Sequence, residues 1–241
     1  VYALDALTGG LQWRFKASST IAASPALSLD GSLYIGSNDH KLYALEQTTG
    51  RLQWTYTTGG EIGGSPIYIS AVDTVYVGSS DGFLYALDPK NNDDHLRWRV
   101  DLGGKVSTPS MGTMGIMYVG THLNKLYAID TNDSASERIL WNLTLDGKVA
   151  GSPSIDNDGT IFVSSYDTGK LYAIDPQLMS VRWEFTVGGN IYASPAIDSN
   201  GVVYVPGLNN ELVAINAYLY DPQNPGNNLE KWRKTLDSSI I

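Results

Sequence analysis

The sequence contains no cysteine, which rules out disulfide bonds and thiolate chemistry. It has few basic residues, with 16 Lys and Arg against 25 Asp and Glu, and its formal net charge is -9. Such a surface would repel the phosphates of a nucleic acid, so we expect no nucleic-acid partner. No apolar run approaches the length of a membrane span, and we expect no insertion into a membrane. The remaining composition, 42% hydrophobic and 17% charged, is typical of a globular protein.

The chain carries an internal repeat that is marked by a serine or threonine followed by proline. These pairs begin at Ser24, Ser65, Thr108, Ser152 and Ser194, in steps of 41, 43, 44 and 42 residues. Short apolar runs lie between successive pairs, separated by turn residues such as Asp30-Gly31 and Asn200-Gly201. A period of about 40–45 residues with four strands per unit is the signature of β-propeller blades. We therefore predict an all-β propeller of four-stranded antiparallel blades.

The repeat sets the expected boundaries within a single propeller domain over residues 1–241. Five full blades are predicted at 20–58, 59–102, 103–145, 146–187 and 188–236. Residues 1–19 would supply the outer strands of a split blade, and 237–241 resemble the start of a further innermost strand. We expect six blades in preference to an arc of a seven- or eight-bladed ring, which would place Ile241 close to Val1. Because Val1 falls inside a repeat, we also expect the chain to be part of a longer protein.

Positions within the repeat predict the roles of its strands. We place the Ser-Pro and Thr-Pro pairs on the innermost strand, because proline lacks an N–H and suits an edge that faces a central channel. The turn between the second and third strands holds one column of residues that tolerate positive φ. This column consists of His40, Gly82, Asn124, Gly169 and Asn210. The backbone therefore accounts for His40 without a chemical role, and we expect His40, His95 and His122 all to be solvated residues of turns or loops.

The six tryptophans occupy one column, on the outermost strand of each repeat. They are Trp13, Trp54, Trp98, Trp141, Trp183 and Trp232. The first copy reads Ala3-x-Asp5-x-x-Thr8-Gly9-x-x-x-Trp13, and the second copy runs similarly from Ala44 to Trp54. This segment resembles the tryptophan-docking motif of the pyrroloquinoline-quinone-like (PQQ-like) repeat family, and later copies keep its Ala and Trp positions. The resemblance implies that each indole lies in the seam between two blades, where the other motif residues dock it.

The same family includes quinone-dependent alcohol and sugar dehydrogenases, so an enzyme is the alternative interpretation. Many alcohol-oxidising members hold the quinone between a planar aromatic residue and a vicinal disulfide, with a Ca²⁺ ion beside it. This chain has no cysteine, and the seam column uses all six tryptophans. We therefore expect no catalytic, cofactor or metal site. The alternative is a degenerate quinoprotein dehydrogenase that depends on pyrroloquinoline quinone.

One face of the predicted propeller carries candidate binding residues. The loop that enters each blade and the turn between its second and third strands should share this face, because the first and third strands run in the same direction. One loop column varies in charge from blade to blade and comprises Thr20, Glu61, Lys105, Lys148 and Asn190. The turns around it add Asp39, His40, Asp81, His122, Tyr166 and Asn209. Such variation suits a binding mouth, although solvation alone would also permit it.

Together these features predict a non-catalytic PQQ-like propeller that serves as a binding platform. The resemblance implies two kinds of role, since family members include an outer-membrane assembly lipoprotein and the extracellular sensor domains of receptor kinases. We expect a protein partner or a small ligand at one face, and a location in the periplasm, at the cell surface or outside the cell. The incomplete blade leaves an open sheet edge, which would permit self-association.

Overall fold

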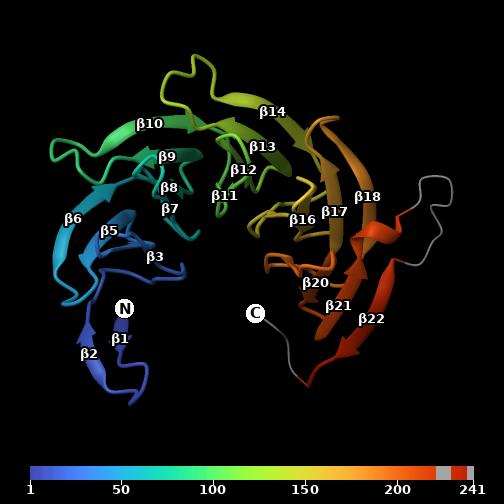
Figure 1. The fold of residues 1–241 in the computed structure, drawn as a ribbon, viewed down its shortest axis with the longest axis horizontal. Helices are drawn as coiled ribbons and strands as arrows, with labels where there is room; N and C mark the ends of the chain where they lie inside the picture. The colour runs from blue at the N-terminus through green and yellow to red at the C-terminus, as the bar shows by residue number, and fades with distance from the viewer. Residues whose placement is uncertain (221–228, 238–241) are drawn as a thin grey trace. The chain divides into compact units, whose positions relative to one another are not determined.

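The computed structural model describes residues 1–220 and 229–237. Over these residues the chain forms one two-stranded and five four-stranded sheets, and the strands of each sheet are antiparallel (Figure 1). The all-β class with four-stranded units is therefore confirmed. The predicted closing strand at 237–241 falls outside the described residues except for its first residue, and so does the expected approach of Ile241 to Val1. No helix in the described part of the chain has the length and apolar character needed to cross a membrane.

The chain divides into two compact units, Val1–Pro109 and Ser110–Ile241. The first unit contains the hairpin β1–β2 and the sheets β3–β6 and β7–β10, in which successive strands are paired. Its strands are β1 (Tyr2–Leu4), β2 (Leu11–Arg14), β3 (Ala26–Leu27), β4 (Ser32–Gly36), β5 (Lys41–Glu46), β6 (Leu52–Thr57), β7 (Ile67–Ile69), β8 (Thr74–Gly78), β9 (Phe83–Leu87) and β10 (Leu96–Asp101).

The second unit contains three four-stranded sheets, β11–β14, β15–β18 and β19–β22, again with successive strands paired. Its strands are β11 (Ser110–Met111), β12 (Ile116–Gly120), β13 (Lys125–Asp130), β14 (Ile139–Thr144), β15 (Ser154–Ile155), β16 (Ile161–Ser165), β17 (Lys170–Asp175), β18 (Ser180–Thr186), β19 (Ala196–Ile197), β20 (Val202–Gly207), β21 (Glu211–Asn216) and β22 (Glu230–Thr235). A short 3-10 helix, η1 (Ala217–Leu219), follows β21.

The innermost strands differ from the sequence prediction, because the Ser-Pro and Thr-Pro pairs lie before them. Each innermost strand has two or three residues and begins directly after the proline. The hydroxyl groups instead accept hydrogen bonds from the backbone of the preceding repeat, over 2.8–2.9 Å. These bonds run from Ser24 N to Ser65 Oγ, from Ser65 N to Thr108 Oγ1, and from Ser152 N to Ser194 Oγ. The pairs therefore connect one repeat to the next.

Each four-stranded sheet contains the same row of three residues, an aromatic, an alanine and a tryptophan. In the sheet β3–β6, Tyr34 is in register with Ala44, and Ala44 is in register with Trp54. The two rings meet across the alanine, with centroids 5.8 Å apart. The equivalent ring pairs of the other sheets are 5.7–6.0 Å apart. The alanine of the motif is thus the spacer that lets two large rings touch.

The first tryptophan shows how an indole docks on the next sheet. Trp13, on the hairpin, donates a hydrogen bond from Nε1 to the carbonyl of Gln47, at 2.8 Å. Gly50 allows this approach, because its φ is +69° and a Cβ there would lie 2.4 Å from the Trp13 ring. Tyr43 and Leu45 of the next sheet belong to the same buried cluster as Trp13. The Trp13 indole is thus held against the following sheet by one hydrogen bond and by apolar packing.

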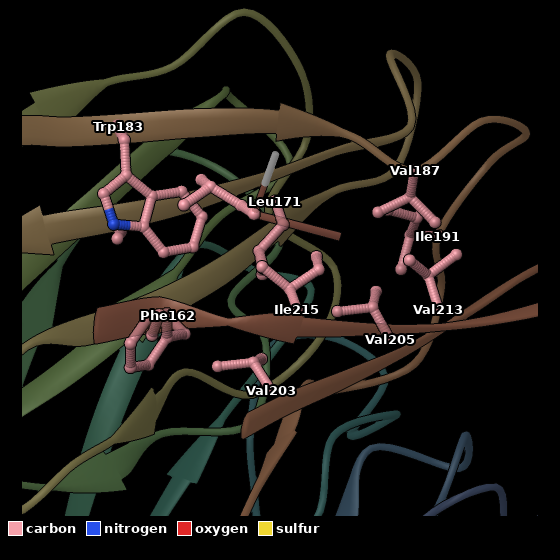
Figure 2. Packing of buried hydrophobic residues seen from close by; sticks show 12 residues of the cluster. Phe162, Leu171, Trp183, Val187, Ile191, Val203, Val205, Val213 and Ile215 are labelled. Carbon is pink, nitrogen blue, oxygen red and sulfur yellow. The ribbon is translucent and has the colours of Figure 1, made fainter. Parts of the chain in front are cut away.

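Figure 2 shows an equivalent seam in the second unit, where Trp183 points from β18 toward strands β20 and β21. Trp183 and Leu171 from one sheet share a buried cluster with Val203, Val213 and Ile215 from the next. These side chains are β-branched or aromatic for the most part, and they fill the space between two sheets. The core of each unit therefore lies in its seams.

The other four tryptophans differ in what they contact. Trp54 and Trp141 also pack against clusters of the following sheet, and Trp98 contacts Tyr76 of its own sheet. Trp232, on β22, is 40% exposed, which differs from the predicted docked position.

The column of predicted positive φ angles is confirmed at all five positions. The angles are 70° at His40, 95° at Gly82, 61° at Asn124, 63° at Gly169 and 65° at Asn210. Each residue ends the turn that leads into the third strand of its sheet. The sequence pattern therefore identified the turn geometry correctly.

Candidate functional site

The candidate loop column and the candidate turns meet through backbone hydrogen bonds. The turn residue donates its N–H, and the loop residue accepts with its carbonyl oxygen. The pairs are Asn38 with Thr20 and Ser80 with Glu61 at 2.9 Å, and Tyr166 with Lys148 and Leu208 with Asn190 at 2.8 Å. The loop that enters each of these sheets is thus fixed against the turn between its second and third strands. The structure therefore places the candidates of one sheet on the same side of that sheet.

Asp39 and Asp81 use their carboxylates inside the fold. Asp39 accepts hydrogen bonds from the Tyr43 hydroxyl at 2.6 Å and from Ser18 N at 2.9 Å, and Asp81 accepts from the Tyr85 hydroxyl at 2.6 Å. Burial raises the pKa of Asp39, but the bonds from Tyr43 and Ser18 outweigh burial and bring the pKa below its ordinary value. Both carboxylates tie a loop to a turn, so we leave them out of the proposed binding surface.

Asp146 also ties a loop to a turn. Here the carboxylate lies on the loop that enters the sheet, whereas Asp39 and Asp81 lie on the turns. It accepts hydrogen bonds from the Tyr172 hydroxyl, from Thr168 Oγ1 at 2.8 Å and from the Lys170 ammonium at 2.9 Å. Burial opposes its ionisation, yet these three donors lower the pKa of Asp146 to about 2. The sequence analysis did not single out this residue.

The remaining candidates of the first unit differ in their exposure. Thr20, Glu61 and His40 are exposed. The positive φ of His40 is the angle that its turn requires, so the backbone explains this residue. Lys105 is half-buried, and its ammonium lies 3.7 Å from where a Cβ on Gly63 would stand. His122, in the second unit, is half-buried in the turn between β12 and β13.

The second unit brings four of its candidates together with two further residues. We call this surface the Tyr192 patch, and it consists of Lys148, Tyr166, Asp167, Asn190, Tyr192 and Asn209. The Lys148 ammonium pairs with Asp167 at 3.2 Å and lies 5.9 Å from the centre of the Tyr166 ring. The Tyr166 ring in turn meets the Tyr192 ring edge to face, with centroids 5.9 Å apart. The Asn209 amide is held at 2.6 Å by Glu211.

Tyr192 is the residue of this patch that the sequence analysis missed. Its column in the repeat otherwise contains small residues, namely Ala22, Gly63, Ser107 and Ala150. Tyr192 is 52% exposed, although a tyrosine has a large apolar ring that burial would favour. The signal was present in the sequence as a single large residue in a column of small ones.

His95 contradicts the expectation that all histidines are solvated. It is 8% exposed, stacks on the Trp54 indole with ring centroids 4.1 Å apart, and places Nδ1 3.0 Å from the Asp88 carbonyl. It therefore belongs to the seam between β3–β6 and β7–β10. Stacking on a tryptophan of the preceding sheet is a long-range contact, which the local loop sequence does not encode.

The dehydrogenase alternative would require a quinone pocket and metal ligands. No three His, Asp or Glu side chains of the described chain gather in a way that could hold a metal ion. Trp13, Trp54, Trp141 and Trp183 are committed to seams, so these indoles are not placed to form the floor of a cofactor pocket. The side chains seen here therefore do not fit the quinone-and-calcium arrangement of the dehydrogenases.

Comparisons with known proteins agree with this repeat architecture. The sequence model of the family described as "Outer membrane protein assembly factor BamB" matches residues 1–94 and 132–218. The crystal structure of BamB from Moraxella catarrhalis superimposes with a TM-score of 0.72 at 18% sequence identity, over 94% of this chain and 65% of that one. The chain thus spans just under two thirds of that relative's length. The comparison with curated proteins found no match. The five four-stranded sheets and the hairpin are blades of a β-propeller, and the chain belongs to the BamB family of PQQ-like repeat propellers.

Proposed function

We propose that this chain is a non-catalytic binding platform for a protein partner, and that the partner docks on the Tyr192 patch. The observation that carries the proposal is the exposed Tyr192 ring, which stands in a column of otherwise small residues and contacts the Tyr166 ring. A repeat protein that needed this position only for folding would do as well with the alanine or glycine of its other blades. The departure at one blade is what a recognition surface requires.

The chemistry of the patch suits a protein surface. Tyrosine buries a large rigid area at low entropic cost and keeps a hydroxyl for hydrogen bonding, so it is enriched at protein interfaces. The edge-to-face contact with Tyr166 restricts the Tyr192 ring before binding, which lowers the cost of ordering it. Lys148, Asp167 and the two asparagines supply a polar rim around the two rings.

The enzyme alternative has less support from this chain. A quinoprotein dehydrogenase would need a planar floor and metal ligands, and the described indoles of the seams are occupied by packing. The family is described as an outer membrane assembly factor, which supports a place in the cell envelope for this protein as well. The partner would then be another protein of the envelope.

Site-specific photo-crosslinking tests the proposed docking surface. A photoreactive phenylalanine derivative at position 192 should give a covalent adduct with a second protein in cells that express the full-length protein. The matched control is position 218, because Tyr218 is exposed to a similar degree, 54%, but lies in η1 between the third and fourth strands of its sheet. Equal adducts at both positions, or none at 192, would overturn the assignment.

Two further measurements accompany the crosslinking. The Tyr192→Ala variant should lose the crosslinked partner in a pull-down while keeping its circular dichroism spectrum and melting temperature. Titration with pyrroloquinoline quinone and Ca²⁺ should leave the absorbance of the quinone unchanged. A saturable absorbance change with dye reduction would instead support the dehydrogenase alternative.

A further inference from the structure

An aspartate and a tyrosine of the last full repeat form a contact that the repeat before it lacks. Both carboxylate oxygens of Asp198 are bonded, since Oδ1 accepts hydrogen bonds from two backbone N–H groups and Oδ2 accepts one from the Tyr204 hydroxyl at 3.1 Å. Asp156 occupies the same repeat position, but the residue six positions after it is Phe162. A phenylalanine has no hydroxyl group to donate.

Asp156 is therefore left with one carboxylate oxygen that has no donor. Its Oδ1 accepts hydrogen bonds from the backbone N–H groups of Asp158 and Thr160, at 2.9 and 2.8 Å. Its Oδ2 is buried and has no hydrogen-bond partner among the residues that the structure describes. The Arg182 guanidinium, which bonds Thr160 Oγ1 at 3.1 Å, pairs with Asp175 instead. A buried carboxylate oxygen without a donor costs free energy, so a ligand that supplies the donor gains affinity.

Asp156 also lines a surface hollow of about 240 Å³, at the turns that follow β15 and β19. Its lining combines apolar, acidic and aromatic groups, which include Ile155, Ile197, Asp156, Asp198 and Tyr218. The hollow is too small for a drug-sized ligand and suits a small molecule. These turns lie at the opposite ends of the strands from the turns of the Tyr192 patch, so the hollow is a separate place on the same unit.

The charge of the hollow favours a cation that carries its own hydrogen-bond donors. The backbone bond from Val202 is the main reason that the pKa of Asp198 lies below its ordinary value, so this carboxylate is ionised at neutral pH. Burial, followed by the negative charges of Asp156 and Asp158, raises the pKa of the Tyr218 hydroxyl, which places this ring close to both carboxylates. A metal ion fits less well, because no three His, Asp or Glu side chains in the described part of the chain are grouped to hold one.

We propose that this hollow binds a small alkylguanidinium compound, whose guanidinium group donates a hydrogen bond to Asp156 Oδ2. A guanidinium is planar, presents several N–H donors and is weakly hydrated, so it can bond a carboxylate while it lies against an aromatic ring such as that of Tyr218. The alkyl part then contacts Ile155 and Ile197. Phe162 creates the site, because the tyrosine of the other repeats would occupy the same oxygen.

Titration of the purified chain with n-butylguanidinium, followed by the NMR shifts of the amides from 156 to 160, tests the proposal. We expect a saturable shift. Two control ligands separate its causes, since n-butylurea has the same shape without the charge and tetramethylammonium has the charge without N–H donors. Each should bind about tenfold more weakly or less, because neither forms a charge-assisted hydrogen bond. No saturable shift with n-butylguanidinium, or equal binding of either control, would overturn the assignment.

The Phe162→Tyr variant tests the origin of the site. Its new hydroxyl stands where Tyr204 bonds Asp198, so it should satisfy Asp156 Oδ2. We expect binding of n-butylguanidinium to weaken by about tenfold and the melting temperature to rise, because a buried oxygen gains its donor. Asp156→Asn should weaken binding by a similar factor. Glu137→Gln is the control, since it removes the same charge from an exposed position between β13 and β14 and should leave the affinity unchanged.

Folding and the proposed function are separated from this result. If Asp156→Asn fails to fold by circular dichroism, Phe162→Tyr still decides, and an unchanged affinity in folded Phe162→Tyr contradicts the proposal. Tyr192→Ala should leave binding of n-butylguanidinium unchanged, and Phe162→Tyr should leave the protein adduct at position 192 unchanged. Position 218 remains a valid control for protein adducts, because the occupant of the hollow is a small molecule.

Discussion

At the scale of single residues, the alanine between two aromatic rings is the most constrained position of the repeat. Ala44 is fully buried, and Tyr34 and Trp54 meet across it at 5.8 Å. The row recurs in every four-stranded sheet, with register partners on both sides of the alanine. A side chain with two or three more carbons would separate the rings and displace the indole from its seam.

We therefore predict that Ala44→Leu destabilises the protein by about 1–3 kcal/mol, the usual cost of overpacking a core. Urea denaturation monitored by tryptophan fluorescence measures the loss. Ala71→Leu is the matched control, because Ala71 is exposed in the turn between β7 and β8 and should tolerate the same change. Equal stability of the two variants would show that the alanine is not a spacer.

At the scale of secondary-structure elements, polar contacts between loops hold neighbouring sheets in place alongside the apolar seams. The hydroxyls of the Ser-Pro and Thr-Pro pairs accept hydrogen bonds from backbone N–H groups of the preceding repeat, and aspartates such as the half-buried Asp39 tie loops to turns. Backbone groups at the ends of very short strands would otherwise lose their partners. These contacts are directional, so they fix how far one sheet can rotate against the next.

The hydroxyl contact is tested by Thr108→Val, which keeps the shape of the side chain and removes the acceptor. Ser65 N would lose the bond of 2.8 Å, and we expect a destabilisation of about 1 kcal/mol. Thr113→Val is the control, since Thr113 is exposed in the turn between β11 and β12. Chemical denaturation of both variants measures the difference, and a neutral Thr108→Val would argue against a stabilising contact.

The contact of Asp146 predicts a pH dependence. The folded state holds the pKa of Asp146 at about 2, below the ordinary value of 3.8. Its stabilisation is therefore complete above the ordinary pKa and is lost as the pH falls toward about 2, because the unfolded chain takes up the proton first. Asp146→Asn should be less stable than the wild type at neutral pH and should lose less stability on acidification.

Thermal melts between neutral and acidic pH measure this difference. Tyr172→Phe removes one of the donors to Asp146 and should reduce the acid sensitivity in the same direction. Asp158→Asn, at an exposed carboxylate in the turn between β15 and β16, is the control. Parallel pH profiles for the wild type and Asp146→Asn would disprove the assigned role.

At the scale of the whole molecule, stability is a sum of blades and seams, since each repeat contacts its neighbours in sequence. The hairpin β1–β2 has two strands and one described seam, and its Tyr2 and Leu4 side chains are exposed. The sheet β3–β6 has four strands and a described seam on both sides, with Trp13 on one and Trp54 on the other. The repeats are thus alike in sequence but differ in the number of seams that bury them.

This inequality predicts the order of hydrogen exchange. Amides of β1 and β2 should exchange well before those of β4 and β5, because few buried contacts oppose local opening of the hairpin. Exchange followed by mass spectrometry at low protein concentration gives the comparison. Equal protection of β1 and β4 would contradict the prediction.

Much of the fold and less of the candidate surface could be predicted from sequence. The repeat, the tryptophan column and the turn residues from His40 to Asn210 are local signals, because each depends on backbone angles or on strand periodicity. The anchoring role of Asp39, the buried stacking of His95 and the exposure of Tyr192 arise between repeats. Such contacts join residues that lie about 20 to 40 positions apart, and no short pattern contains both partners.

The sequence by itself determined the blade, since a period of four short strands with a tryptophan at a constant position leaves one way to bury the apolar residues of each unit. Tertiary structure decided which polar residues remain available for a partner. Aspartates and hydroxyls that look alike in the sequence form internal hydrogen bonds wherever the fold brings a donor close to them. Those groups are then not available to a partner. Side chains such as Tyr192 and Trp232 stay exposed because no described neighbour covers them.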